Sequence, residues 1–221
     1  MGLGLGTLVD SGEAALPGGV SYLEFLAPGL LAAACMQTAS FDASWPVLGK
    51  LRWQRNYEAM IATPVGIADV VLGELVWTAV RLCTVALAFS LVMVLFGAAR
   101  ASFRMPLAAG AAVLTGLAFT TPILAYAATL KTGDTFNVLF RFGITPLFLF
   151  SGVFFPITRL PQVLQKVAWA TPLFHGVELV RGLTLDTIES HAWIAHLAYL
   201  SAMTAAGFVL ALRTFRRSLY P

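Results

Sequence analysis

Five apolar stretches alternate along the chain with short segments that carry most of its charges. A helix needs about 20 apolar residues to cross the hydrocarbon core of a bilayer. Because lipid offers no hydrogen bonds to the backbone, spanning segments of this kind fold as α-helices. The pattern therefore predicts an all-α, polytopic transmembrane helical bundle with five spans, at residues 22–46, 68–96, 106–130, 136–155 and 192–212.

The composition supports this fold class. Hydrophobic residues make up 58% of the chain and charged residues only 11%, with a mean hydropathy of +0.81, whereas about a quarter of a soluble domain is charged. Cys35 and Cys83 both lie in apolar stretches and are interpreted as small hydrophobic residues. The net charge of +3 is too small to indicate a nucleic-acid partner. We expect a single transmembrane domain, residues 1–221, in the lipid bilayer.

The connection between the fourth and fifth spans, residues 156–190, is too apolar for a free loop, and its apolar runs are too short for another span. Pro161 and Pro172 divide it, because proline lacks the N–H that continues a helix. Trp169 is typical of the interface between membrane and water. The segment is therefore predicted to form two short helices that do not cross.

The distribution of basic residues predicts the orientation of the bundle, because lysine and arginine are enriched on the cytoplasmic side. Three groups fall on the same side by the order of the spans, in the first loop, the third loop and the C-terminal tail: Lys50, Arg52, Arg55, Lys131, Arg213, Arg216 and Arg217. We expect this side to face the cytoplasm, with the C-terminus inside.

Residues 50–64, within "KLRWQRNYEAMIATPVG", have the period of a short amphipathic helix that Pro64 ends. Its apolar side would carry Trp53, Tyr57, Met60 and Ile61. Its polar side would carry Arg52, Arg55 and Glu58. Two interpretations remain open. The basic residues contact anionic lipid headgroups, or the helix is a lever that binds a cytoplasmic partner.

Polar and aromatic residues on otherwise aliphatic spans are candidates for a substrate path. In the first and fourth spans these are Gln37, Thr38, Phe41, Thr145, Phe148, Ser151 and Phe155. Contact with lipid or packing inside the bundle is the alternative for each aromatic residue.

Among the charged residues within the predicted spans, we single out Asp42, Glu74 and Arg81 as intramembrane charges. An arginine at the centre of a membrane helix costs about 2.5–3.5 kcal/mol, so Arg81 is expected to point into the bundle. Glu74 lies seven residues before Arg81 on the same side of the helix. We expect a Glu74–Arg81 pair that locks the bundle; a site for a substrate headgroup is the alternative.

Two long segments, "YLEFLAPGLLAAACMQTASFDASWPVLGKLRWQRNYEAMIATPVGIADVVLGE" and "LFLFSGVFFPITRLPQVLQKVAWATPLFHGVELVRGL", resemble the membrane permeases of type-2 ABC exporters. The resemblance is to the group of nodulation-factor exporters and daunorubicin-resistance permeases. It covers nearly all of the chain, from residue 22 to residue 217. The family motifs fall at residues 25–29, 52–65, 151–156 and 160–183.

The resemblance implies a family fold of six spans, with residues 50–64 as the coupling helix and residues 156–190 re-entering the outer leaflet. The apolar start "MGLGLGTLV" has only nine residues, and we expect the interface helix and first span of the family to be missing from this chain. The resemblance also implies two permease copies that meet through the first and fourth spans listed above. The permease would then be coupled to a separate ABC ATPase through five residues: Arg52, Trp53, Arg55, Tyr57 and Glu58.

The chain has no G-x-x-x-x-G-K-[ST] phosphate loop, since Leu51 follows Gly49 and Lys50. We therefore expect a non-enzymatic transport subunit without a cofactor, with ATP and Mg²⁺ held by the ATPase. The resemblance implies export across a bacterial inner membrane by alternating access. A wide apolar path suits an amphipathic drug, a lipid or a lipo-oligosaccharide. The alternatives are an ion-driven carrier or channel, and an intramembrane serine hydrolase that uses Ser151 and His175.

Overall fold

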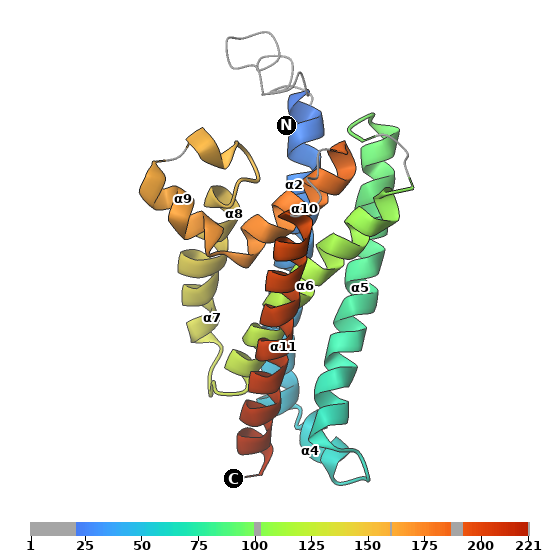
Figure 1. Cartoon of the computed structure of the whole chain (residues 1–221). Helices are drawn as coiled ribbons and strands as arrows, with labels where there is room; N and C mark the ends of the chain where they lie inside the picture. The colour runs from blue at the N-terminus through green and yellow to red at the C-terminus, as the bar shows by residue number, and fades with distance from the viewer. Residues whose placement is uncertain (1–20, 100–102, 160, 187–191, 221) are drawn as a thin grey trace.

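The computed structural model describes residues 21–99, 103–159, 161–186 and 192–220. These residues form helices and connecting turns, with no strand among them, which confirms the predicted all-α bundle. The nine apolar residues on which the expectation of a missing first span rests lie outside the described part. Figure 1 shows α4 and the C-terminus at one end of the bundle, and α9 and the beginning of α2 at the other.

Among the described residues, three helices are long and apolar enough to cross a membrane: α5 (Ile67–Leu95), α6 (Met105–Ala127) and α11 (Ala192–Leu219). They correspond to the second, third and fifth predicted spans. The first predicted span is α2 (Tyr22–Asp42), which continues through α3 (Trp45–Leu48) into the π-helical turn η1 (Gly49–Trp53). Most of α2 is buried between α5, α6 and α10 (Pro172–Leu185), so its polar side chains face protein more than lipid.

Two helices, α2 and α10, begin where side chains accept hydrogen bonds from their first N–H groups. At the beginning of α2, the Ser21 hydroxyl accepts the N–H of Leu23, and the Glu24 carboxylate accepts the N–H of Ser21. At the beginning of α10, the Thr171 hydroxyl accepts the N–H of Phe174, and Pro172 occupies a position that needs no donor. Local sequence therefore determines where these two helices start.

The fourth predicted span consists of α7 (Asp134–Leu139), the π-helical turn η2 (Phe140–Ile144) and α8 (Thr145–Phe150). The Thr145 hydroxyl donates to the carbonyl of Phe140, five residues earlier, at 2.8 Å. The segment α7–η2–α8 stands to one side of the other helices (Figure 1). Trp45 of α3 connects it to the bundle, with ring centroids 5.3 Å from Phe136 and 5.1 Å from Phe140.

The connection 156–190 contains the short 3₁₀ turn η3 (Ile157–Arg159), α9 (Gln162–Trp169) and α10. Pro161 immediately precedes α9, and Pro172 is the first residue of α10. Neither helix is as long as a span. The second of them packs against α2, α6 and α11 and is largely buried.

The central helix α6 packs closely against its neighbours through small residues. It contacts α2, α5, α10 and α11 and crosses the bundle diagonally (Figure 1). Ala108, Ala112 and Gly116, the small-residue face of the third predicted span, are buried within the chain. A Cβ atom added at Gly176 or at Gly207 would lie 2.3 Å from the hydroxyl oxygen of Thr115 or Thr121. These contacts set the distances of α10 and α11 from α6.

We expect Gly207→Ala to lower stability by about 1–3 kcal/mol, because the added methyl group overpacks the contact between α11 and α6. The thermal midpoint of the purified protein in a neutral detergent measures this. Gly110→Ala is the matched control, since a Cβ at Gly110 meets no atom within 4 Å. If Gly207→Ala and Gly110→Ala have the same thermal midpoint, the close approach of α11 to α6 is contradicted.

Candidate coupling surface and transport groove

The predicted coupling helix at 50–64 is not continuous, so this prediction is wrong in its local structure. The π-helical turn η1 ends where the N–H of Gln54 donates to the carbonyl of Gly49. Arg55 then adopts a left-handed conformation (φ 52°) and changes the direction of the chain, and α4 (Asn56–Ile61) begins after it. A non-glycine residue in this region costs about 1–2 kcal/mol, which the contacts on either side of the turn must offset.

Tyr57 connects α4 to two of the membrane helices. Its side chain is buried, and its hydroxyl donates to Oε1 of Glu74 on α5 at 2.7 Å. Its ring lies 5.7 Å from that of Phe215 on α11. Burial, together with the neighbouring Glu74, raises the pKa of Tyr57. The hydroxyl therefore stays protonated and keeps its role as a donor.

Two basic side chains of η1 also bind groups on or next to the membrane helices α5 and α6. Lys50 Nζ donates to Oε1 of Glu74 at 2.6 Å. Arg52 donates to the carbonyls of Leu130 and Ala128, at 3.0 and 3.3 Å, just beyond the C-terminal end of α6. A cation is favourable there because the last carbonyls of a helix carry partial negative charge. The Arg52 guanidinium thus binds this chain's own backbone, and its contact with a partner stays a prediction.

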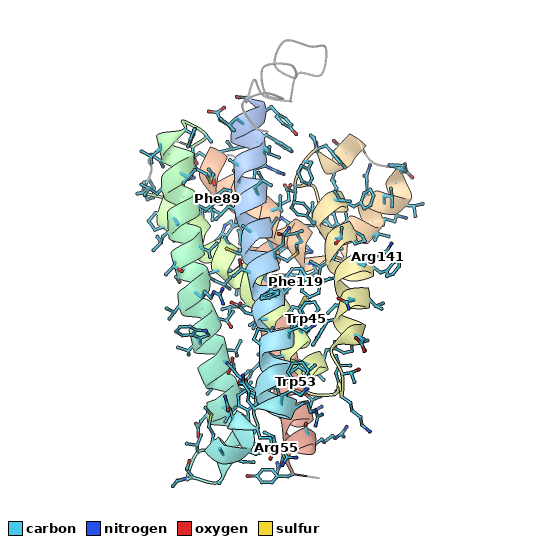
Figure 2. The ribbon with its side chains drawn as sticks, turned by 180° about the vertical axis from the view of Figure 1, so that it is seen from behind. Trp45, Trp53, Arg55, Phe89, Phe119 and Arg141 are labelled. Atoms are coloured by element: carbon cyan, nitrogen blue, oxygen red, sulfur yellow. The ribbon has the colours of Figure 1, made fainter. Side chains whose placement is uncertain are left out.

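What remains at the surface is smaller than the predicted amphipathic helix. Trp53 is 68% exposed and Met60 is 46% exposed, while Tyr57 of the same predicted stripe is buried. Arg55 and Glu58 are exposed and form a weak ion pair at 3.8 Å. Trp53 and Arg55 lie at the end of the bundle in Figure 2. We call the four exposed side chains the coupling surface: Trp53, Arg55, Glu58 and Met60.

A groove of about 370 Å³ lies between α2 and the η2–α8 segment. It is lined by three aromatic rings, one aliphatic side chain, an amide and a hydroxyl: Gln37, Phe41, Phe140, Ile144, Thr145 and Phe148. The structure thus brings together four of the predicted path residues from two different spans. Sequence patterns missed Phe140 and Ile144. Both lie in the π-helical turn η2, whose wider turn rotates less per residue than an α-helix and so shifts side chains away from the positions that α-helical periodicity predicts.

Three predicted path residues lie elsewhere. Thr38 and Phe155 are partly buried and do not line the groove. Ser151 is buried. The Thr171 hydroxyl donates to the carbonyl of Ala168, so the Ser151 hydroxyl is the donor in its hydrogen bond with Thr171. Ser151 is therefore corrected to a residue that holds the turn after α8 against the start of α10. This contact also occupies the hydroxyl that the hydrolase alternative requires.

The charges inside the membrane pair differently from the prediction. Arg81 Nη1 donates to Oδ1 of Asp42 on α2 at 2.7 Å, and Glu74 binds Lys50 and Tyr57. The predicted Glu74–Arg81 pair is wrong because seven residues of helix separate the two groups by about 10 Å along the axis. A neighbouring helix offers nearer partners. Two ion pairs therefore connect α5 to the chain that runs from α2 to η1.

Arg181 has a structural role that sequence analysis did not indicate. Its buried guanidinium donates to the carbonyls of Gly152 (2.8 Å) and Phe25 (3.3 Å) and to Glu178 (3.1 Å). It also lies 3.8 Å from the centre of the Phe25 ring. The side chain joins α10 to the beginning of α2 and to the turn after α8. The signal in the sequence was an arginine within an apolar helix.

Apolar helices long enough to cross a membrane, with an aromatic groove beside them, fit a membrane transport subunit. The profile of the ABC-2 type transporter family matches residues 1–185, and the chain belongs to this family. The protein is a membrane permease of an ABC transporter. Permeases of this family work with an ABC ATPase.

Several curated proteins are similar over most of the chain. Nodulation protein J of Rhizobium meliloti (strain 1021) is 30% identical over 224 residues, which cover 100% of this chain and 82% of the relative. Nodulation protein J of Rhizobium leguminosarum bv. trifolii is 34% identical over 84% of this chain and 68% of its own length. The inner membrane transport permease YadH of Escherichia coli (strain K12) is 26% identical over 72% of this chain and 61% of its own.

Proposed function

We propose that this permease moves an amphipathic substrate outward across the inner membrane of a bacterium, by alternating access that a separate ATPase subunit drives. The ATPase binds ATP and Mg²⁺, and this chain contributes no cofactor. The observation that carries the proposal is the coupling surface, because its neighbours Tyr57 and Arg52 contact three membrane helices. Tyr57 contacts α5 and α11, and Arg52 binds carbonyls at the end of α6. Similarity to a protein named as an inner membrane transport permease supports the location.

The contacts of the coupling surface suggest how movement of the ATPase reaches the membrane. Trp53, Arg55, Glu58 and Met60 contact the ATPase. Tyr57 then transmits their displacement to α5 through Glu74 and to α11 through Phe215. Arg52 transmits it to the end of α6.

The groove between α2 and η2–α8 forms part of the substrate path, with Gln37, Phe41, Thr145 and Phe148 at its surface. A second permease copy faces this groove from the other side, so that two chains enclose one path. The basic end of α11, with Arg216 and Arg217, then lies in the cytoplasm. An apolar, aromatic groove of this kind suits a drug, a lipid or a lipo-oligosaccharide.

A double charge reversal, Arg55→Glu with Glu58→Arg, tests the coupling surface. It keeps the net charge, so attraction to anionic headgroups is almost unchanged, but it inverts the pattern that a protein partner reads. We expect normal membrane insertion and a loss of roughly tenfold or more in substrate-stimulated ATP hydrolysis and in export, since one specific charged contact at an interface is worth about 1.4 kcal/mol or more. The measurement uses the complex reconstituted in vesicles.

The matched control reverses two exposed charges where α6 connects to α7, Lys131→Asp in the loop with Asp134→Lys at the first residue of α7. It is expected to leave stimulated ATP hydrolysis near the wild-type rate. Export that survives the reversal of Arg55 and Glu58 would show that they contact lipid headgroups instead. Transport that needs no ATP would favour an ion-driven carrier.

A further inference from the structure

Arg81 is a charged residue in the middle of a membrane helix that is nevertheless half exposed. It lies 14 residues beyond Ile67, the first residue of α5, which places it about 21 Å along the helix axis. The hydrocarbon core is about 30 Å thick. Its side chain is 51% exposed, and Trp77 and Val80 beside it are exposed apolar residues. A cation at this depth is unfavourable against lipid, so its exposed side requires polar surroundings.

In the ion pair between Arg81 and Asp42, one side chain is buried and the other is half exposed. The Asp42 carboxylate is 7% exposed and receives one hydrogen bond from the described residues, from Arg81 Nη1. The other carboxylate oxygen, Oδ2, is buried and has no partner among those residues. The Asp42 carboxylate is therefore buried inside the bundle, and the Arg81 guanidinium lies at the surface of the bundle. A guanidinium has five N–H donors in a planar fork, so several remain for an acceptor outside the chain.

Polar side chains continue this site along the boundary between α2 and α5. Thr38 lies one turn before Asp42 on the same side of α2, and Thr84 lies one turn after Arg81, with its hydroxyl bound to the Arg81 carbonyl. We call these four residues the polar seam: Thr38, Asp42, Arg81 and Thr84. Phe41, which lines the groove, directly precedes Asp42. The polar seam and the aromatic groove therefore occupy adjacent faces of α2.

We propose that the polar seam binds the anionic headgroup of the transported amphiphile, through a phosphate, sulfate or carboxylate, while its apolar part lies in the groove. This inference rests on the proposed function and adds the substrate class to it. The arginine fork matches the geometry of such an oxyanion. Asp42 compensates the charge of Arg81 when the site is empty, which limits the cost of keeping the cation in the membrane.

The experiment measures ATP-dependent movement of two fluorescent lipids in phosphatidylcholine vesicles that contain the permease and its ATPase. One probe is NBD-labelled phosphatidylglycerol, which is anionic, and the other is NBD-labelled glucosylceramide, which is neutral. The double variant Asp42→Asn with Arg81→Gln removes both charges and leaves neither stranded. We expect it to slow the anionic probe relative to the neutral one by roughly tenfold or more, as for the loss of a charge-assisted hydrogen bond.

The single variant Asp42→Asn gives an expectation of opposite sign. It leaves the guanidinium without its counter-charge, so preference for the anionic probe should rise. Arg141→Gln is the matched control, since Arg141 is an exposed arginine on η2 that does not line the groove. It is expected to leave the ratio of the two rates unchanged.

Three results would overturn the inference. If the double variant slows both probes equally and lowers the thermal midpoint, the ion pair only holds α2 to α5. If the ratio changes only when the vesicles contain unlabelled phosphatidylglycerol, the headgroup belongs to a resident lipid. If wild-type complex moves only the neutral probe, the substrate class is wrong while the export function stands; movement of neither probe, without stimulated ATP hydrolysis, contradicts both.

Discussion

Replacing Arg181 with alanine is expected to destabilise the protein by about 3 kcal/mol, because each hydrogen bond to a buried charged group is worth about 1.5–3 kcal/mol and such contributions are not additive. The variant leaves the carbonyls of Gly152 and Phe25 without the donor that now joins them. The beginning of α2 and the turn after α8 then lose their shared contact with α10.

The thermal midpoint in a neutral detergent measures this loss. Arg181→Lys keeps the charge but not the planar fork, so its midpoint should fall between those of the wild type and the alanine variant. Lys166→Ala, at an exposed position on α9, is the matched control and should change stability by less than about 0.5 kcal/mol. Equal midpoints for Arg181→Ala and Lys166→Ala would show that Arg181 does not hold these elements together.

Tyr57→Ala is expected to have the second large effect, on both stability and coupling. Truncation of a buried aromatic side chain costs about 3–5 kcal/mol, and here it also removes the donor to Glu74 and the ring against Phe215. We expect α4 to lose its connection to α5 and α11. The assembled complex should then hydrolyse ATP without stimulation by substrate.

Tyr57→Phe separates the packing of the ring from the hydrogen bond. It keeps the contact with Phe215 and loses a hydrogen bond worth about 1 kcal/mol. Its thermal midpoint should stay close to that of the wild type, with coupling reduced in part. Both variants are compared at equal amounts of assembled complex, from stimulated ATP hydrolysis and export. Full stimulation in Tyr57→Ala at a lowered midpoint would limit Tyr57 to a structural role.

The main features of the fold were predictable because they depend on average composition. Runs of apolar residues located the helices that cross, and Pro161 and Pro172 predicted the boundaries of α9 and α10. Four groove residues were predictable for a related reason. A polar or aromatic side chain such as Gln37 or Phe148 is unusual on an aliphatic span, and both come to the one surface where α2 faces η2–α8.

The errors arose where the structure departs from a regular α-helix or depends on the register of two helices. Helical periodicity assumes one uninterrupted helix over 50–64, and the left-handed Arg55 divides the predicted stripe between the surface and the interior. The partner of Arg81 depends on how α5 lies against α2. A pattern along one helix offers Glu74 and cannot show that Asp42 is closer.

The glycine contacts of α6 also have a consequence for biosynthesis. Thr115 and Thr121 lie on a helix that emerges from the ribosome well before Gly176 and Gly207, their partners on α10 and α11. Until α10 and α11 are in place, these two faces of α6 lack the partners that they have in the folded protein. This part of the core is therefore formed late in synthesis. Nascent chains that stop before residue 207 present an unfinished surface, which membrane proteases and chaperones can distinguish from the finished permease.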